Sequence, residues 1–168
     1  MSQTARLRMR RVALLVVLVL VAPSTVNAEE LIGRATVVDG DTLGIRGEKI
    51  RLNGIDAPEA SQRCARPSGE EWRCGQKAAL ALSEKIGHRN VRCEGTERDR
   101  WGRLIAVCSL GDQDLNAWLV RRGWAVAYRR YSKDYVGQED RAQKAKLGVW
   151  SGTFDMPWDW RKAQRRKD

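Results

Sequence analysis

Histidine is almost absent from this chain, and several short catalytic signatures are missing. Its 168 residues contain one histidine, His88. Phosphodiesterases and nucleases that use paired histidines, or histidine with an asparagine and a metal, therefore cannot be built from it. The sequence has neither a Gly-Lys-Ser/Thr phosphate loop nor a Gly-x-Ser-x-Gly nucleophile elbow. His88 follows Gly87 near an expected helix end, which suits a surface or capping residue. Carboxylates, arginines and a bound metal are the groups left for chemistry.

Cysteine is scarce, and its spacing argues against zinc. No Cys-x-x-Cys pair occurs, and one histidine cannot complete a typical zinc site. The four cysteines are an even set, as expected for disulfides in an oxidising compartment. They allow three connectivities, and we favour Cys64–Cys74 and Cys93–Cys108 because each pair flanks one short local structure. Each bridge would contribute up to about 3 kcal/mol in the chain-entropy model.

Long hydrophobic runs are also lacking. The one apolar run, Val12 to Ala22, has 11 residues, whereas a membrane-spanning helix needs roughly 20. Four arginines precede it, and Val26-Asn27-Ala28 follows as a small-residue cleavage pattern. This layout predicts a secretory signal peptide at residues 1–28 and a periplasmic or secreted protein without a membrane segment after cleavage. An uncleaved anchor is the alternative, and N-terminal sequencing of the exported protein would separate the two.

Acidic residues are outnumbered by basic ones. The chain has 31 Lys and Arg against 21 Asp and Glu, a formal net charge of +10 at pH 7. Without the expected signal peptide, which holds four of the arginines, the net charge is +6. A cationic domain of this size favours an anionic partner, with nucleic acid or an anionic lipid surface as candidates.

Hydrophobic periodicity predicts one small domain of short strands and helices. Alternating apolar and polar residues indicate strands between Gly33 and Leu52, with turns at Asp39–Asp41 and Gly47. Further strands are expected at 91–93, 104–110 and 124–128, and helices at 74–86, 115–123 and 135–147. Ser68 and Glu71 match a capping box ahead of the first helix. This pattern favours an α+β fold that is mostly β: a five-stranded oligonucleotide-binding (OB) barrel with three packed helices.

Carboxylates and an arginine gather in two neighbouring segments. Asp39 and Asp41 share one turn, and Asp56 and Glu59 follow across a rigid proline. Arg51 stands in the middle of the strand between them. Each residue alone would be an ordinary turn former, surface charge or ion-pair partner. Carboxylates on two adjacent loops, however, supply the oxygen ligands that a hard cation requires.

Three ordered motifs resemble the staphylococcal-type nuclease (thermonuclease) family, and its exported bacterial members in particular. They are Val38–Thr42, Arg51–Glu59 and Asp99–Arg103, and Leu147–Trp150 closes the last helix as the family does. The resemblance implies a nuclease-like domain at 29–150, followed by an aromatic and basic extension at 151–168. It also implies the barrel with helices, calcium dependence, and endonuclease cleavage of DNA and RNA that leaves 3′-phosphates.

The resemblance assigns calcium ligands and a general base. Asp41 and Asp56 would supply carboxylates to Ca²⁺, and Ala57 its backbone carbonyl. Ala57 stands where staphylococcal enzymes have threonine, which changes little because only the carbonyl is needed. Glu59 would take a proton from the attacking water, directly or by orienting it, an effect worth about 10²–10⁴-fold in rate.

Nucleic-acid contacts are assigned in the same way. Arg51 and Arg103 would bind the non-bridging phosphate oxygens, for which a planar, bidentate guanidinium is suited. The alternative for each is an ion pair with a carboxylate on a neighbouring strand. Arg100, Trp101 and Tyr128 would contact the nucleic acid. Trp101 replaces a tyrosine of the family and can stack on a base without donating a phenolic hydrogen bond. Tyr128 is balanced between base stacking and core packing.

Two segments depart from the staphylococcal enzyme. The segment Cys64–Cys74 is absent from it and would stiffen a loop over the site. Near the C-terminus, Phe154–Arg161 holds an aromatic cluster ahead of a basic run, Arg161–Lys167. That run either is solvated or adds nonspecific phosphate affinity, and we favour a solvated tail.

Two other functions stay open from the sequence alone. The same fold could bind nucleic acid without cleaving it, but such a module would be expected to lose Arg51, Glu59 or Arg103, and all three are present. The basic surface could instead bind anionic lipid or wall polymer without calcium. The nuclease hypothesis further expects a monomer that prefers single-stranded DNA and RNA and has no stable protein partner.

Overall fold

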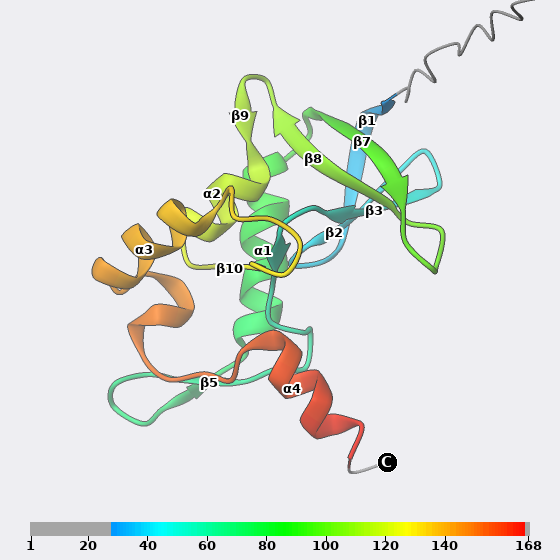
Figure 1. Ribbon diagram of the computed structural model, residues 1–168. Helices are drawn as coiled ribbons and strands as arrows, with labels where there is room; N and C mark the ends of the chain where they lie inside the picture. Colours follow the sequence, from blue (N-terminus) through cyan, green and yellow to red (C-terminus); the bar gives the residue numbers. More distant parts are fainter. Residues whose placement is uncertain (1–27, 167–168) are drawn as a thin grey trace, which may run out of the picture.

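The barrel is formed by five strands in a computed structural model that describes residues 28–166 (Figure 1). The signal peptide expected at residues 1–28 thus lies outside the described residues, apart from Ala28. The barrel strands are β1 (Glu29–Asp39), β2 (Thr42–Ile45), β3 (Glu48–Leu52), β7 (Asn90–Arg98) and β8 (Leu104–Leu110). Neighbouring strands pair antiparallel, and β3 pairs parallel with β8 to close the sheet. The predicted α+β fold with a five-stranded OB barrel is confirmed.

Alternation of side chains explains why these segments form a closed sheet. Along β1 half-buried and exposed residues alternate, and β3 and β8 bury every second residue. The inward-facing residues form the core together with apolar residues of the helices; barrel members include Leu43, Ile45, Ile50, Leu52 and Leu104. The β1–β2 turn falls at Asp39–Asp41 as predicted, and the Asp41 N–H donates to Asp39 Oδ1 at 3.0 Å.

Within residues 28–166 four α-helices lie beside the barrel, one more than expected. They are α1 (Cys74–Ile86), α2 (Leu115–Arg121), α3 (Val136–Lys144) and α4 (Pro157–Gln164), and a short 3₁₀ turn, η1 (Gly148–Ser151), precedes the last. In Figure 1, α1 stands in the middle of the molecule, with the barrel strands on its right and α3 on its left. The extra helix, α4, is made by the C-terminal extension, whose basic run, Arg161–Lys167, was expected to be solvated.

The capping-box prediction at Ser68 is wrong. The cap residue of α1 is Arg73, and Glu71–Trp72 forms a short strand, β6, that pairs with β5 (Cys64–Ala65). The disulfide Cys64–Cys74 closes this hairpin, so the chain is still extended at 71–72, where the capping box required helix. The four-residue spacing that predicted the helix itself is confirmed, because Cys74, Ala78, Leu82 and Ile86 are all buried.

The strand expected at 124–128 forms outside the barrel. Only Val126–Ala127 is extended (β10), and it pairs antiparallel with β4 (Ile55–Asp56) in a separate two-stranded sheet. A further short strand, β9 (Gln113–Asp114), pairs antiparallel with the end of β8 at the edge of the main sheet.

Both favoured disulfides, Cys64–Cys74 and Cys93–Cys108, are formed, the second between directly paired residues of β7 and β8. Within residues 28–166, no helix is both long and apolar enough to cross a membrane.

Asn116 of α2 ties the helix to the barrel and to the turn that follows β3. Its side chain is fully buried, accepts from the Cys108 N–H at 3.2 Å, and donates to Asn53 O at 3.0 Å and to Ala106 O at 3.2 Å. These bonds use the amide in both its donor and acceptor roles. Asn116 therefore holds the chain immediately after Arg51 in place.

Replacing Asn116 by alanine should lower the free energy of unfolding by about 1–3 kcal/mol, because buried backbone groups lose their partner. Chemical denaturation of the disulfide-bonded protein measures this loss. Asn90→Ala is the matched control, since Asn90 is exposed at the start of β7 and should change stability little. Equal stability of the two variants would contradict the role given to Asn116.

Candidate active site

The candidate site is a cleft of about 930 Å³ between the barrel and the C-terminal segment. Its walls include Arg51 of β3, Glu59 of the loop after β4, and Trp101 and Arg103 of the β7–β8 hairpin. Tyr128 and Arg161 also line it. Asp39 of the first family-like motif lines it too, so the cleft brings together residues from all three motifs. It also contains Arg161, which was expected to lie in a solvated tail.

Arg51 lies between two buried carboxylates. It forms an ion pair with Asp41 Oδ1, and its Nη2 donates to Asp56 Oδ1 at 2.7 Å. Asp41 is 2% exposed and Asp56 is 0% exposed. Burial works against the charged form of Arg51, but Asp41 and Asp56 outweigh it and raise the pKa of the guanidinium. The structure therefore shows the ion pairing considered as the alternative role of Arg51, while the same residue also lines the cleft.

Strand register explains why distant residues meet here. Arg51 is the pairing partner of Thr42, so the residue just before β2, Asp41, lies next to it. The backbone strengthens this contact, because the Leu52 N–H donates to Asp41 O at 2.9 Å. Asp41 Oδ2 accepts from the Ala57 N–H at 2.6 Å, which joins the turn after β1 to the segment that follows Asp56.

The donor chemistry of Asp41 and Asp56 suits a hard cation. Two buried carboxylates from adjacent loops offer oxygen ligands, to be completed by carbonyl or water oxygens. Burial raises the pKa of Asp41 to about 8, with Arg51 acting in the opposite direction. A further positive charge beside Asp41 would favour its ionised form. Within residues 28–166, no group of three or more His, Cys, Asp and Glu side chains is arranged to hold a metal.

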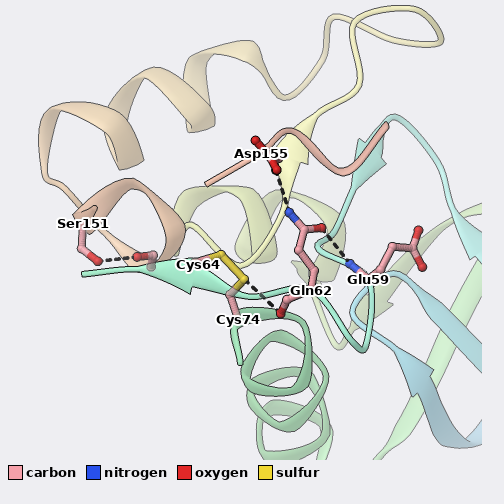
Figure 2. The surroundings of a disulfide bond; sticks show 7 residues. Glu59, Gln62, Cys64, Cys74, Ser151 and Asp155 are labelled. Carbon is pink, nitrogen blue, oxygen red and sulfur yellow. Dashed lines mark hydrogen bonds between the residues drawn. A yellow bond between two sulfur atoms is a disulfide. The ribbon is translucent and has the colours of Figure 1, made fainter. Parts of the chain in front are cut away.

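Glu59 is held at both its backbone and its side chain. Its N–H donates to Oε1 of the buried Gln62 at 3.2 Å, and its carboxylate accepts from Arg161 Nη1 at 2.7 Å. Figure 2 shows Gln62 between Glu59 and the backbone of Asp155, to which the Gln62 amide donates at 2.7 Å. The Glu59 side chain keeps 32% exposure, so it remains accessible from the cleft.

Arg103 is anchored by Asp99 across the hairpin turn. Its Nε donates to Asp99 Oδ2 at 2.7 Å, and its backbone N–H donates to Asp99 Oδ1 at 3.0 Å. Burial alone would raise the pKa of Asp99, but hydrogen bonds from the Arg103 side chain and backbone outweigh it and lower the pKa. Nη1 lies 3.5 Å from Thr42 Oγ1, while Nη2 has no hydrogen bond among the described residues. Arg103 is thus oriented by an ion pair and still has donors to offer.

Of the residues expected to contact nucleic acid, Trp101 and Tyr128 line the cleft, and Arg100 neighbours Trp101. Trp101 is 65% exposed at the hairpin tip, with the guanidinium of Arg100 4.1 Å and that of Arg103 5.1 Å from its ring centre. Tyr128 is half-buried and stacks on Trp158 of α4, with ring centres 5.2 Å apart and planes at 8°. Packing against Trp158 therefore occupies one face of Tyr128.

The prediction of a solvated tail is wrong for Arg161. This residue belongs to α4 and contacts Asp56 and Glu59, because buried acidic oxygens attract a guanidinium whose helix is packed against the site. Spacing gave no signal for this contact, which spans 102 residues from Glu59. Gln62 and Trp158 were not predicted as site residues either. The one signal was the Trp-Asp-Trp-Arg run at 158–161, whose aromatic residues favour packing of the extension against the domain.

Comparisons with known proteins identify the family of this chain. The family model described as "Staphylococcal nuclease homologue" matches residues 49–152. A micrococcal nuclease of Shigella flexneri is 30% identical, over 97% of this chain and 97% of its own length. An uncharacterized endonuclease of Haemophilus influenzae is 34% identical over 77% of this chain and 71% of its own length.

A succinoglycan biosynthesis protein of Rhizobium meliloti is 40% identical over 73% of this chain and 66% of its own length. The family match covers more than half of the chain and includes Arg51, Asp56, Glu59 and Arg103. These comparisons support a nuclease. The chain belongs to the staphylococcal nuclease homologue family.

Proposed function

We propose that this protein is an exported, calcium-dependent endonuclease that hydrolyses phosphodiester bonds of DNA and RNA and leaves 3′-phosphates. The observation that carries the proposal is one cleft lined by Arg51, Arg103 and Glu59, beside the buried pair Asp41 and Asp56. This set combines phosphate binding, proton transfer and a place for a hard cation within one site.

The two arginines would bind the scissile phosphate. Each arginine is anchored by carboxylates, yet the side chains of Arg51 and Arg103 are 20% and 21% exposed and line the cleft. Asp41 and Asp56 orient Arg51, and Asp99 orients Arg103. Oriented guanidinium groups hold the negative charge that builds on the non-bridging oxygens during attack, without reorganising at that moment.

Glu59 would act as the general base. The attacking water gives a proton to the Glu59 carboxylate as its oxygen bonds to phosphorus. The bond from phosphorus to the 5′-oxygen breaks, and the departing 5′-oxygen takes up a proton from solvent. This leaves a 3′-phosphate on one product and a 5′-hydroxyl on the other. The bonds of Glu59 to Gln62 and Arg161 fix where that carboxylate sits.

Asp41 and Asp56 would hold the calcium ion, together with the backbone carbonyl of Ala57. Bound there, Ca²⁺ supplies a positive charge that polarises the phosphate and helps to place the water. The pair is well buried, which strengthens its attraction for a cation relative to a solvated pair.

Export and substrate form are part of the same proposal. Two disulfides favour an oxidising compartment, either periplasmic or extracellular. Single-stranded DNA and RNA would be the preferred substrates, because exposed Trp101 can stack on an unpaired base. We expect the protein to act as a monomer without a stable protein partner.

The test is release of acid-soluble nucleotides from single-stranded DNA by the chain beginning at Glu29, with calcium and then with EGTA. Cleavage in calcium and its loss in EGTA are expected. Parallel reactions with duplex DNA and RNA measure preference, and end-labelling of products with and without phosphatase identifies 3′-phosphates.

Absence of cleavage in calcium, with tight and salt-sensitive DNA binding retained, would replace the nuclease by an inactive nucleic-acid-binding module. Binding to anionic lipid vesicles or wall polymer without calcium dependence, and without affinity for DNA, would instead favour an envelope-binding protein.

A further inference from the structure

Helix α4 reaches the candidate active site through Arg161. Its Nη1 donates to Glu59 Oε1 at 2.7 Å and to Asp56 Oδ1 at 3.0 Å, and its Nη2 donates to Asp56 Oδ2 at 2.7 Å. The guanidinium of Arg161 therefore donates two hydrogen bonds to Asp56 and a third to Glu59. The family match ends at residue 152, before α4 begins at Pro157.

This geometry limits the freedom of Glu59. The carboxylate of Glu59 is partly exposed, so without a partner its side chain would sample several rotamers. Arg161 links it to Asp56, which is completely buried and is also bonded to Arg51. The rigid fork of the guanidinium thus fixes Glu59 relative to the phosphate-binding Arg51.

Several independent contacts hold α4 in position. Trp158 stacks on Tyr128, and Pro157 is buried at the first turn of the helix. Gln62, fully buried, donates to Asp155 O just ahead of α4 and accepts from the Glu59 N–H (Figure 2). A buried side chain between the two segments couples the position of α4 to that of the Glu59 loop.

The disulfide-bonded segment supports the same arrangement. The Ala65 N–H donates to Thr153 O at 2.9 Å, and the Thr153 N–H donates back to Ala65 O at 3.0 Å. Ala65 follows Cys64, whose disulfide to Cys74 anchors this strand to the start of α1. The chain leading into α4 is therefore paired with a covalently closed hairpin.

We propose that Arg161 is a positioning residue of the active site, which holds Glu59 and Asp56 in their working geometry and makes the C-terminal helix an integral wall of the site. This inference rests on the proposed nuclease function. The cysteine hairpin and Gln62 serve it by docking α4. A nuclease domain that ended at residue 152 would lack this part of the site.

The opposite role, a plug that competes with a cation, gives opposite results. Both oxygens of Asp56 accept from Arg161, so a guanidinium that blocks the site would weaken calcium binding and slow cleavage. Removing such a plug would accelerate the enzyme. Removing a positioning residue would slow it, because misplacement of a catalytic group by about 1 Å can cost 10²-fold.

The experiment compares Arg161→Ala, Arg161→Lys and Lys162→Ala in the chain beginning at Glu29. Lys162 is exposed on the same helix, so its removal subtracts the same charge away from the cleft. Steady-state cleavage of a single-stranded oligonucleotide gives kcat and KM, calorimetry gives the calcium Kd, and thermal unfolding checks the fold. We expect Arg161→Ala to lower kcat by about 10²-fold with little change in KM. Arg161→Lys should recover part of the loss, and Lys162→Ala should match wild type.

A double variant tests whether Arg161 acts through Glu59. Arg161→Ala added to Glu59→Gln should lower kcat less than Arg161→Ala does alone, because residues in one network are not additive. Wild-type kcat in a folded Arg161→Ala variant would overturn the proposal, as would faster cleavage with tighter calcium binding. An inactive wild-type protein would instead refute the proposed nuclease function itself, so the two failures are distinguishable.

Discussion

Replacing Arg103 by alanine is expected to lower kcat on single-stranded DNA by about 10³–10⁵-fold, the range for an arginine that serves a phosphoryl transition state. Among the described residues, Asp99 and, weakly, Thr42 accept hydrogen bonds from Nε and Nη1 of this side chain, so its remaining donors can bind phosphate. Because Asp99 and Arg103 lie in a hairpin turn, loss of their ion pair should not unfold the barrel. Steady-state kinetics in calcium, alongside circular dichroism, measure both effects.

Arg92→Ala is the matched control for this prediction. Arg92 is an exposed arginine of β7 that pairs with Glu30 and Glu94 and does not line the cleft. Such surface pairs contribute about 0.2–1 kcal/mol, so kcat should stay at the wild-type value. A folded Arg103→Ala variant that cleaves as fast as Arg92→Ala would show that the Asp99 pair is the whole role of Arg103.

Replacing Glu59 by glutamine should lower kcat by about 10²–10⁴-fold while the protein stays folded and still binds DNA. Glutamine keeps the size of the side chain and can still accept a hydrogen bond from Arg161, but it cannot take a proton from water. Loss of rate with an unchanged DNA Kd is therefore the signature of the general base. Single-turnover cleavage and filter binding measure the two quantities.

Glu71→Gln provides the comparison at an exposed site. Glu71 forms a surface ion pair with Arg63 in the disulfide hairpin, and its side chain is 64% exposed. The Glu71→Gln substitution should leave kcat unchanged. If Glu59→Gln and Glu71→Gln cleave equally fast, the general base lies elsewhere, and the proposed mechanism fails at its proton-transfer step.

The proposed mechanism makes the C-terminal helix part of the active site. Arg161 and Gln62 connect the loop that carries Glu59 to α4, and the Cys64–Cys74 hairpin docks the chain that leads there. These contacts suggest a physical reason why the cysteine segment would stiffen the chain beside the site. The segment is joined through backbone bonds to the extension that reaches the carboxylates.

Local pattern was sufficient for most secondary structure. Alternation predicted the barrel strands, four-residue spacing predicted α1, and glycine-rich or Asp-Gly turns separated them. Both disulfides followed from the short structures that each pair flanks. Such features depend on residues that are close in sequence, where periodicity carries information. The ordered motifs added the family, because they preserve residue types at fixed spacing.

The tertiary structure alone decided how these parts meet. Closure of the barrel by the parallel β3–β8 pairing, the separate β4–β10 sheet and the contact of Arg161 with Glu59 join residues far apart in sequence. No period links such positions, because their proximity depends on how whole elements pack. The sequence by itself thus determined most of the elements and the chemistry available, whereas packing decided that Arg161 lies against Asp56 and Glu59 rather than in solvent.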